Sequence, residues 1–192
     1  MNRTRAGVLI SGRGSNMSAL IQAAKAEDYP AQIALVLANT PDAGGLEAAA
    51  AEGVAAKAIE SRPFGKDREA HERALDTALR EAGVEVVCLA GYMRLLTPWF
   101  VDAWSGRMLN IHPSLLPAFK GLHTHARALE AGVAEAGCTV HLVTADLDAG
   151  PILGQARVPV LPGDDEHVLA ARVLVEEHKL YPKVLAEFCR GL

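Results

Sequence analysis

The feature of this sequence that most constrains its fold is a series of short apolar segments separated by stretches with helical spacing. Residues 85–90 are almost continuously apolar, which is typical of a strand in a parallel sheet that is covered on both faces. Residues 7–10 and 33–38 are similar runs, and residues 66–82 place alanine and leucine at the spacing of a helix face. This alternation, through the first two-thirds of the chain, predicts an α/β fold with a mostly parallel central sheet covered by helices on both faces.

The remaining elements follow from the same periodicities and from their end signals. Further strands are expected at residues 54–59, 107–111, 137–144 and 152–160, and further helices directly after residue 16, at residues 46–52, 97–104 and 123–131, and after residue 165. Asp164 and Asp165 are expected to cap the last helix, and Pro182 to bend or split it. A chain of 192 residues without repeats or linkers suits one domain, residues 1–192.

The composition argues against several classes of partner. Nineteen basic residues against 23 acidic residues give a formal net charge of −4, so no basic stripe indicates nucleic acid. The apolar run at residues 6–10 is too short for a signal peptide, and no stretch has the length of a membrane span. The three cysteines, Cys88, Cys138 and Cys189, are widely spaced, which is typical of reduced thiols in the cytoplasm.

A glycine-rich loop, Gly-Arg-Gly-Ser-Asn at residues 12–16, lies between an apolar run and a helical pattern. A strand, a glycine loop and a helix N-terminus together present backbone N–H groups to an anion. The loop lacks the Gly-Lys-Ser/Thr of a P-loop. It has Met17 where a dinucleotide fingerprint has glycine, and Asn39 stands where that fingerprint has an acidic residue. The sequence therefore predicts a phosphate site for a small ligand, with a plain tight turn as the alternative.

Asn110 and His112 stand one residue apart where the strand expected at residues 107–111 ends. In an extended chain such side chains point to the same face, so an amide donor and an imidazole would meet one ligand. Pro113 favours an extended backbone at His112. The best candidate for an acid beside the histidine is Asp148, whereas Asp146 is expected to be a solvated turn residue. A polar strand end leading into a turn is the alternative interpretation.

The segment 110–117, Asn-Ile-His-Pro-Ser-Leu-Leu-Pro, resembles the signature of the folate-dependent formyltransferases. Residues 121–125, Gly-Leu-His-Thr-His, are similar to the branch of that family that acts on glycinamide ribonucleotide, and the resemblance extends from residue 7 to about residue 188. It implies the formyltransferase fold with a Rossmann-like N-terminal half. It also implies 10-formyltetrahydrofolate as co-substrate, glycinamide ribonucleotide as acceptor, no metal, and a monomer or homodimer.

The same resemblance assigns roles to residues elsewhere in the chain. Those assigned to the ribonucleotide are Gly14, Ser15 and Asn16 for its phosphate and Glu177 for its ribose hydroxyls. Those assigned to the folate are Arg68, Met93, Arg94, Leu95, Leu96 and Asn110. The alternatives are a solvated arginine, a surface glutamate, and core packing of the apolar side chains in the 93–96 segment. His123 and His125 have the His-x-His spacing of metal ligands but lack a further ligand set, so no metal is assigned.

The implied reaction is direct formyl transfer through a tetrahedral oxyanion, without a covalent enzyme intermediate. Asn110 is expected to donate a hydrogen bond to the oxyanion, and His112, as imidazolium, to stabilise it and move a proton. Asp148 is expected to stabilise the charged histidine and to position a water. The rivals are a 10-formyltetrahydrofolate hydrolase and a methionyl-tRNA formyltransferase, whose usual extra domains are not expected here. A non-catalytic nucleotide-binding domain is a rival of another class.

Overall fold

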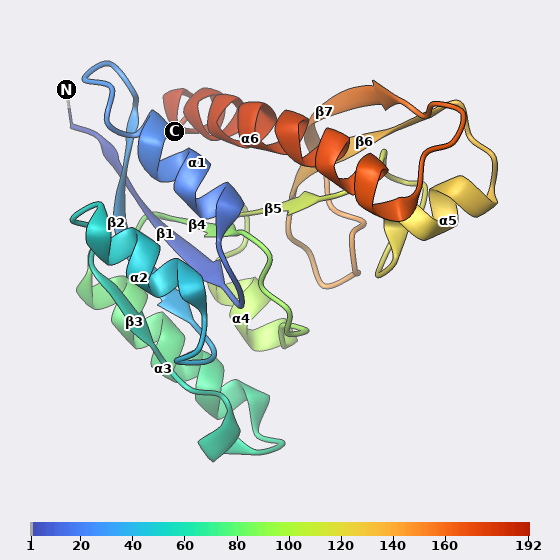
Figure 1. Cartoon of the computed structure of the whole chain (residues 1–192). Coiled ribbons are helices and arrows are strands. Elements are labelled where there is room, and N and C mark those ends of the chain that lie inside the picture. The colour runs from blue at the N-terminus through green and yellow to red at the C-terminus, as the bar shows by residue number, and fades with distance from the viewer. Residues whose placement is uncertain (1) are drawn as a thin grey trace.

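The computed structural model describes residues 2–192 and contains one seven-stranded sheet (Figure 1). The strands lie in the order β3 (Ala56–Ala58), β2 (Ala31–Ala38), β1 (Thr4–Ile10), β4 (Val86–Leu89), β5 (Met108–His112), β6 (Glu135–Leu142) and β7 (Ile152–Pro159). The first five run parallel, and β6 and β7 are antiparallel to their neighbours. The predicted fold class, a mostly parallel sheet covered on both faces, is confirmed.

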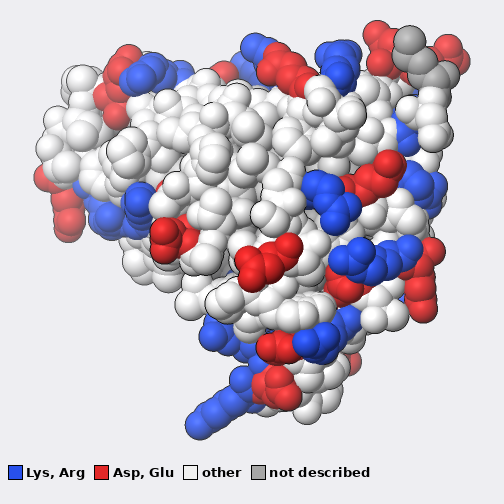
Figure 2. Space-filling model, turned by 180° about the vertical axis from the view of Figure 1, so that it is seen from behind, with Lys and Arg blue, Asp and Glu red and all other residues white. Residues whose placement is uncertain are grey.

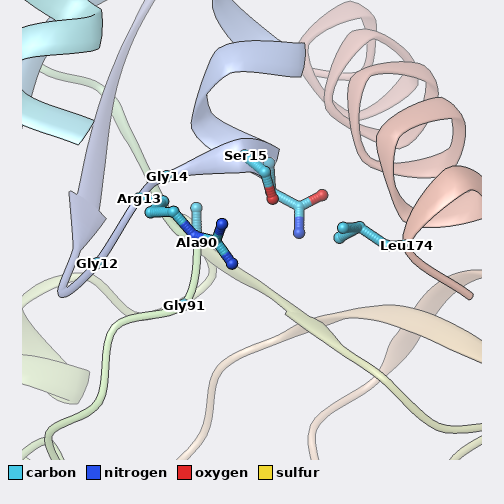
Figure 3. Close-up of a pocket in the computed structure, with 8 residues that line it drawn as sticks. Gly12, Arg13, Gly14, Ser15, Ala90, Gly91 and Leu174 are labelled. Carbon is cyan, nitrogen blue, oxygen red and sulfur yellow. The ribbon is translucent and has the colours of Figure 1, made fainter. Parts of the chain in front are cut away.

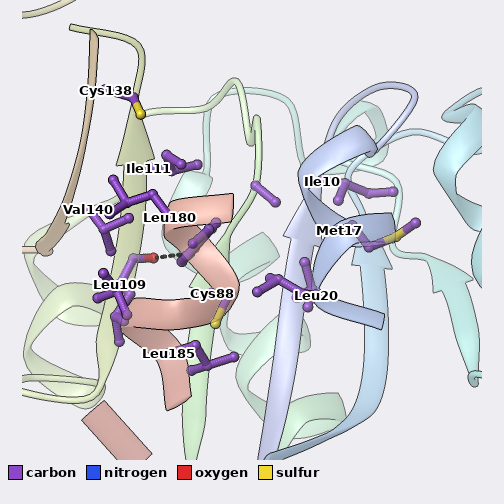
Figure 4. Close-up of a cluster of buried hydrophobic side chains, with 14 of the residues drawn as sticks. Ile10, Met17, Leu20, Cys88, Leu109, Ile111, Cys138, Val140, Leu180 and Leu185 are labelled. Carbon is purple, nitrogen blue, oxygen red and sulfur yellow. Dashed lines mark hydrogen bonds between the residues drawn. The ribbon is translucent and has the colours of Figure 1, made fainter. Parts of the chain in front are cut away.

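Helices cover both faces of this sheet and create two apolar clusters. One face carries α1 (Ser15–Ala23), α2 (Gly44–Ala51), α5 (Thr124–Glu130) and the long α6 (Glu166–Arg190). The other face carries α3 (Arg68–Glu81) and α4 (Pro98–Ala103), which follow a short 3₁₀ turn at Arg62–Phe64. Figure 4 shows the first cluster, in which Met17 and Leu20 of α1 and Leu180 and Leu185 of α6 lie against the strands.

The last helix differs from its sequence-based description in two ways. It is one helix from Glu166 to Arg190 and is not split at Pro182, because the buried Tyr181 and Leu185 on either side hold it against the sheet. Its cap is Asp165 alone, whose carboxylate accepts the backbone N–H of Val168 at 2.8 Å.

The expectation that Asp164 also caps this helix is wrong. Its carboxylate instead accepts the backbone N–H of Leu161 at 2.7 Å and two hydrogen bonds from Arg172, at 2.5 and 2.9 Å. The hydrogen bonds from Arg172, with a smaller contribution from Leu161, lower the pKa of Asp164 to about 2. This side chain therefore fastens the turn before α6 to the helix.

The order of the strands determines where a ligand can bind. From β1 the chain builds β2 and β3 on one side, then returns to place β4 and β5 on the other. The loops that leave β1 and β4 diverge at this switch point, which leaves an open crevice at the carboxyl ends of the strands. The antiparallel pairing of β5 with β6 sets Asn110 opposite His141. Both features bring polar side chains to one edge of the sheet.

The surface carries both signs of charge. On the face shown in Figure 2, lysine and arginine side chains alternate with aspartate and glutamate side chains around a stretch of uncharged residues. Within residues 2–192, none of the helices is both long enough and apolar enough for a membrane crossing.

Candidate active site

A cavity of about 350 Å³ occupies the switch point between β1 and β4 (Figure 3). Its lining comes from the glycine loop, the end of β4 and helix α6, namely Gly12, Arg13, Gly14, Ser15, Asn16, Ala90, Gly91 and Leu174. The three residues predicted to hold a phosphate, at positions 14–16, therefore line one cavity at the N-terminus of α1. The loop connects the end of β1 to the start of α1, as the sequence predicted.

Two glycines give the loop its shape. Gly14 caps α1 in the left-handed conformation, with φ 69°, which other residues rarely adopt. Gly45, at the start of α2, donates its backbone N–H to the carbonyl of Gly12 at 3.0 Å. A Cβ atom on Gly45 would lie 2.5 Å from the Cδ1 atom of Ile10 and 3.1 Å from the carbonyl oxygen of Arg13, so a larger residue would require these neighbours to shift. This hydrogen bond holds the glycine loop against the start of α2.

A buried hydrogen bond closes one side of the cavity. The Nδ2 atom of Asn16 donates to Oε1 of Glu177 at 3.2 Å, and the two residues are 9% and 7% exposed. Burial raises the pKa of Glu177, and the hydrogen bond from Asn16 opposes that rise. The Oδ1 atom of Asn16 is buried and has no partner in residues 2–192. Asn16 therefore connects the cavity lining to a buried carboxylate.

Asn110, His112 and Asp148 lie together beside this cavity-bearing edge of the sheet, with His141 among them. The Nδ1 atom of His112 is 3.5 Å from Oδ2 of Asp148, and Nε2 of His141 is 3.7 Å from Oδ1 of the same carboxylate. The Nδ2 atom of Asn110 is 3.3 Å from Nε2 of His141. Only 3–7% of each histidine and aspartate side chain is exposed, so these groups interact with little screening by water.

The two histidines have different neighbours. The Nε2 atom of His112 is 2.9 Å from the carbonyl oxygen of Phe119, and its Nδ1 atom lies 3.5 Å from Oδ2 of Asp148, so acceptors face both ring nitrogens. His141 donates from Nδ1 to the carbonyl of Leu142 at 2.9 Å, and its Nε2 atom accepts from Asn110. Burial lowers the pKa of His141, which keeps this ring neutral.

A strained turn presents the carboxylate of Asp148. Its backbone has φ 49°, a left-handed conformation that aspartate tolerates better than most residues. Its Oδ2 atom accepts the backbone N–H of Gly121 at 2.9 Å, which ties this turn to the loop after β5. Gly150 crosses Leu142 so closely that a Cβ atom would lie 1.8 Å from the Leu142 carbonyl oxygen. Asp146, by contrast, is exposed, as expected of a solvated turn residue.

The loop between β4 and α4, residues 91–97, is held at three backbone points. Ser11 accepts the N–H of Met93 at 2.8 Å, Arg68 donates to the carbonyl of Leu95 at 3.1 Å, and the buried Glu72 accepts the N–H of Thr97 at 2.8 Å. The side chains of Met93 and Leu95 are 67% and 64% exposed, so core packing does not explain them. Leu96 is half-buried against the core, and so is Arg94 within the loop.

The histidine pair at positions 123 and 125 lies apart from any ligand set. His123 caps α5 in a left-handed conformation, and His125 is half-buried in the first turn of that helix. Residues 2–192 contain no group of three or more histidine, cysteine or acidic side chains arranged to hold a metal ion.

Sequence reasoning missed His141 as a site residue. It lies in an apolar, alternating strand, where a histidine resembles an ordinary half-buried polar residue. The signal that could have found it is the antiparallel register, in which Asn110 pairs with His141 and His112 with Thr139. That register depends on the turns around β6, which periodicity does not reveal.

Residues 4–185 match the formyl transferase family. The phosphoribosylglycinamide formyltransferase of Escherichia coli (strain K12) is 47% identical over 184 residues, which are 96% of this chain and 86% of that protein. A crystal structure of phosphoribosylglycinamide formyltransferase from Brucella melitensis has a TM-score of 0.94 and 54% identity, and the match covers 100% of this chain and 98% of that chain.

Larger proteins contain a similar region. The trifunctional purine biosynthetic protein adenosine-3 of Homo sapiens is 46% identical over 189 residues, and that of Drosophila pseudoobscura pseudoobscura 48% over 191 residues. The match covers 98% of this chain in both cases, and the chain spans only 19% and 14% of those two relatives.

Fold, cavity and the match over nearly all of the chain agree on one class of protein. The chain belongs to the formyl transferase family, as the sequence signature predicted. Within that family it is similar to the phosphoribosylglycinamide formyltransferases of E. coli and B. melitensis named above, along almost its full length.

Proposed function

We propose that this protein transfers the formyl group of 10-formyltetrahydrofolate to the amine of glycinamide ribonucleotide, in de novo purine biosynthesis. The observation that carries the proposal is the convergence of Asn110, His112 and Asp148 beside a glycine loop suited to a phosphate. The similarity to phosphoribosylglycinamide formyltransferases supports the choice of acceptor. The three free, buried cysteines suit a reducing cytoplasm, and the proposed assembly is a monomer or homodimer.

The proposed ribonucleotide site is the cavity at the N-terminus of α1. Gly14, Ser15 and Asn16 offer the phosphate their backbone N–H groups, because the first N–H groups of a helix have no carbonyl partner within it. The carboxylate of Glu177, which accepts from Asn16, is the proposed partner of the ribose hydroxyls.

The proposed folate site is the 91–97 loop together with Arg68 and Asn110. The exposed side chains of Met93 and Leu95 form apolar walls, with Leu96 and Arg94 next to them, and the backbone between them offers donors and acceptors to a heterocycle. Arg68 holds this loop through the carbonyl of Leu95.

In the proposed reaction the amine attacks the formyl carbon, and the carbonyl oxygen becomes an oxyanion. Asn110 directs one Nδ2 hydrogen to His141, so its second hydrogen is free for the oxyanion; such a donor is worth about 100- to 1000-fold in rate. His112, charged against Asp148, stabilises the same oxygen. A water held by Asp148 carries the proton from the attacking nitrogen to the leaving folate nitrogen as the carbon–nitrogen bond breaks, and no covalent enzyme intermediate forms.

The decisive assay measures release of tetrahydrofolate from 10-formyltetrahydrofolate by the purified protein, with and without glycinamide ribonucleotide. The proposal expects release only when the ribonucleotide is present, together with one formylated ribonucleotide for each tetrahydrofolate. Equal release without any acceptor would identify a hydrolase instead. Transfer to methionyl-tRNA but not to the ribonucleotide would identify the other rival, and tight binding without turnover would identify a non-catalytic nucleotide-binding domain.

A further inference from the structure

Among residues 2–192, Arg13 is the only charged residue that lines the cavity at the switch point. Figure 3 shows it on the side of Ala90 and Gly91, with Leu174 of α6 on the opposite side. Its backbone is fixed, because the neighbouring carbonyl of Gly12 accepts the N–H of Gly45 at 3.0 Å. None of the salt bridges and side-chain hydrogen bonds within residues 2–192 uses its guanidinium group. The backbone that carries Arg13 is therefore fixed, and its guanidinium group is available to a ligand.

The other groups around this cavity supply little positive charge. Helix α1 has no acidic residue in its first turn and no side-chain cap, so its N–H groups are open, but they supply only a partial charge. Leu174 supplies no polar atom. Glu177, bonded to Asn16, is negative when ionised and has its pKa raised by burial. A phosphate dianion in this cavity would find one full positive charge, that of Arg13.

We propose that Arg13 binds the phosphate group of the ribonucleotide and sets the preference of this site for phosphorylated ligands. The inference rests on the proposed function for the identity of the ligand. The guanidinium plane and the N–H groups of α1 take the phosphate oxygens, since arginine suits two parallel hydrogen bonds to an oxyanion. The Glu177 carboxylate, which accepts from Asn16, takes the hydroxyl hydrogens. Hydrogen-bond donors thus bind the phosphate end of a ribose phosphate, and an acceptor binds its hydroxyl groups.

The test is steady-state kinetics of Arg13→Ala with glycinamide ribonucleotide and with the unphosphorylated glycinamide riboside. A hydrogen-bonded charge pair is worth about tenfold to a hundredfold in binding, so the KM for the ribonucleotide should rise by that factor. The turnover number and the KM for the formyl folate should stay within about twofold, because Arg13 touches neither reacting atom. The riboside should be used equally well by wild type and variant. Arg13→Lys should recover part of the loss.

Arg157→Ala is the matched control, because that exposed arginine pairs with Glu135 on the edge strand β7, outside the cavity lining. It should leave all of these constants unchanged. The inference is overturned if Arg13→Ala keeps the wild-type KM for the ribonucleotide, or if ribonucleotide and riboside lose activity by the same factor.

Calorimetric binding of ribose 5-phosphate separates this inference from the proposed reaction, since it requires no turnover. If Arg13→Ala weakens this binding about tenfold or more while the wild type transfers no formyl group, the role of Arg13 stands and the proposed reaction fails. If the wild type transfers the formyl group and the variant binds ribose 5-phosphate normally, the role of Arg13 fails alone.

Discussion

At the scale of single residues, one carboxylate lies close to two histidines. Asp148 faces Nδ1 of His112 at 3.5 Å and Nε2 of His141 at 3.7 Å. Acceptors face both ring nitrogens of His112, whereas Nε2 of His141 has the Asn110 amide at 3.3 Å in addition to Asp148. Asp148 acts to raise the pKa of His141, but burial outweighs it and lowers that pKa, so the neutral ring can accept from Asn110.

Replacing Asp148 with asparagine removes the negative charge but keeps a side chain of similar size and shape. The amide oxygen can still accept the N–H of Gly121, so the turn should remain folded. We expect the turnover number to fall by about 100-fold or more, because the imidazolium of His112 loses its counter-ion, and the melting temperature to change little. Asp146→Asn is the matched control, since Asp146 is exposed and two residues away. Equal activity of the two variants would remove Asp148 from the mechanism.

Asn110→Ala tests the oxyanion donor. Among the side chains of residues 2–192, the Nδ2 atom of Asn110 contacts only His141, so its loss should cost little stability. The turnover number should fall by about 100- to 1000-fold, with the KM for the ribonucleotide nearly unchanged. Kinetics and a thermal melt on the same preparation give both quantities. Near-normal turnover would contradict the assigned role.

The buried histidines should make the fold sensitive to acid. Burial lowers the folded-state pKa of four of them, His71, His125, His141 and His178. Because their unfolded pKa is about 6.5, the unfolded chain binds more protons below that pH, so the free energy of unfolding should fall as the pH drops from about 6.5 through the folded values.

Urea unfolding at a series of pH values between about 7.5 and 5 measures this dependence. His71→Gln should flatten it, because His71 is almost fully buried and its Nδ1 atom has no partner in residues 2–192. A free energy of unfolding that rose on acidification across this range would contradict the argument.

At the scale of elements, helix α3 positions the candidate folate loop. Arg68 and Glu72 lie one turn apart on α3 and hold the backbone of Leu95 and Thr97. Ser11, at the end of β1, holds Met93 and also donates to Asn39 at 2.6 Å. The loop that carries exposed apolar side chains is thus fixed through its backbone, which leaves those side chains available to a ligand.

Glu72→Ala should weaken folate binding without touching the folate. It removes the acceptor for Thr97, so the end of the loop should become mobile, the KM for the formyl folate should rise about tenfold, and stability should fall by about 1–3 kcal/mol. The KM for the ribonucleotide should stay within about twofold. Glu72→Gln should retain most function, because an amide can accept from the N–H of Thr97 and donate to its hydroxyl.

Glu69→Ala is the control on the same helix, because Glu69 is exposed and, within residues 2–192, its carboxylate pairs only with Arg73. If both Michaelis constants rose equally in Glu72→Ala, the effect would be general destabilisation rather than loss of positioning.

At the scale of the whole molecule, helix α6 joins the two halves of the sheet. It packs against α1, β6 and β7, and Tyr181 donates its hydroxyl to the carbonyls of Leu89 and Leu109, at 3.0 and 3.2 Å. The apolar cluster on this face combines residues of α6 with strands from both halves of the sheet, so the chain should behave as one domain.

Unfolding should therefore be a single cooperative transition. The two tryptophans, Trp99 and Trp104, report on the face covered by α3 and α4, whereas far-UV circular dichroism has a large contribution from the 25 residues of α6. Urea titrations followed by the two signals should give the same midpoint. Two separate midpoints would show that the halves unfold independently.

The sequence by itself determined the fold class, the order of the elements and most of the candidate residues. Apolar runs such as residues 85–90 are typical of strands in a covered parallel sheet, and Asn110 and His112 share a face because strand residues alternate. These are local consequences of backbone geometry, so they can be predicted from the sequence.

Only the tertiary structure decided which distant groups meet. His141 reaches Asn110 through an antiparallel register, Glu177 reaches Asn16 across 161 positions of sequence, and Pro182 stays inside one helix because packing outweighs its local preference. Asp164 is drawn away from the helix cap by Arg172 in the same way. Such contacts depend on how whole elements pack, and no periodicity within a short window of sequence encodes that packing.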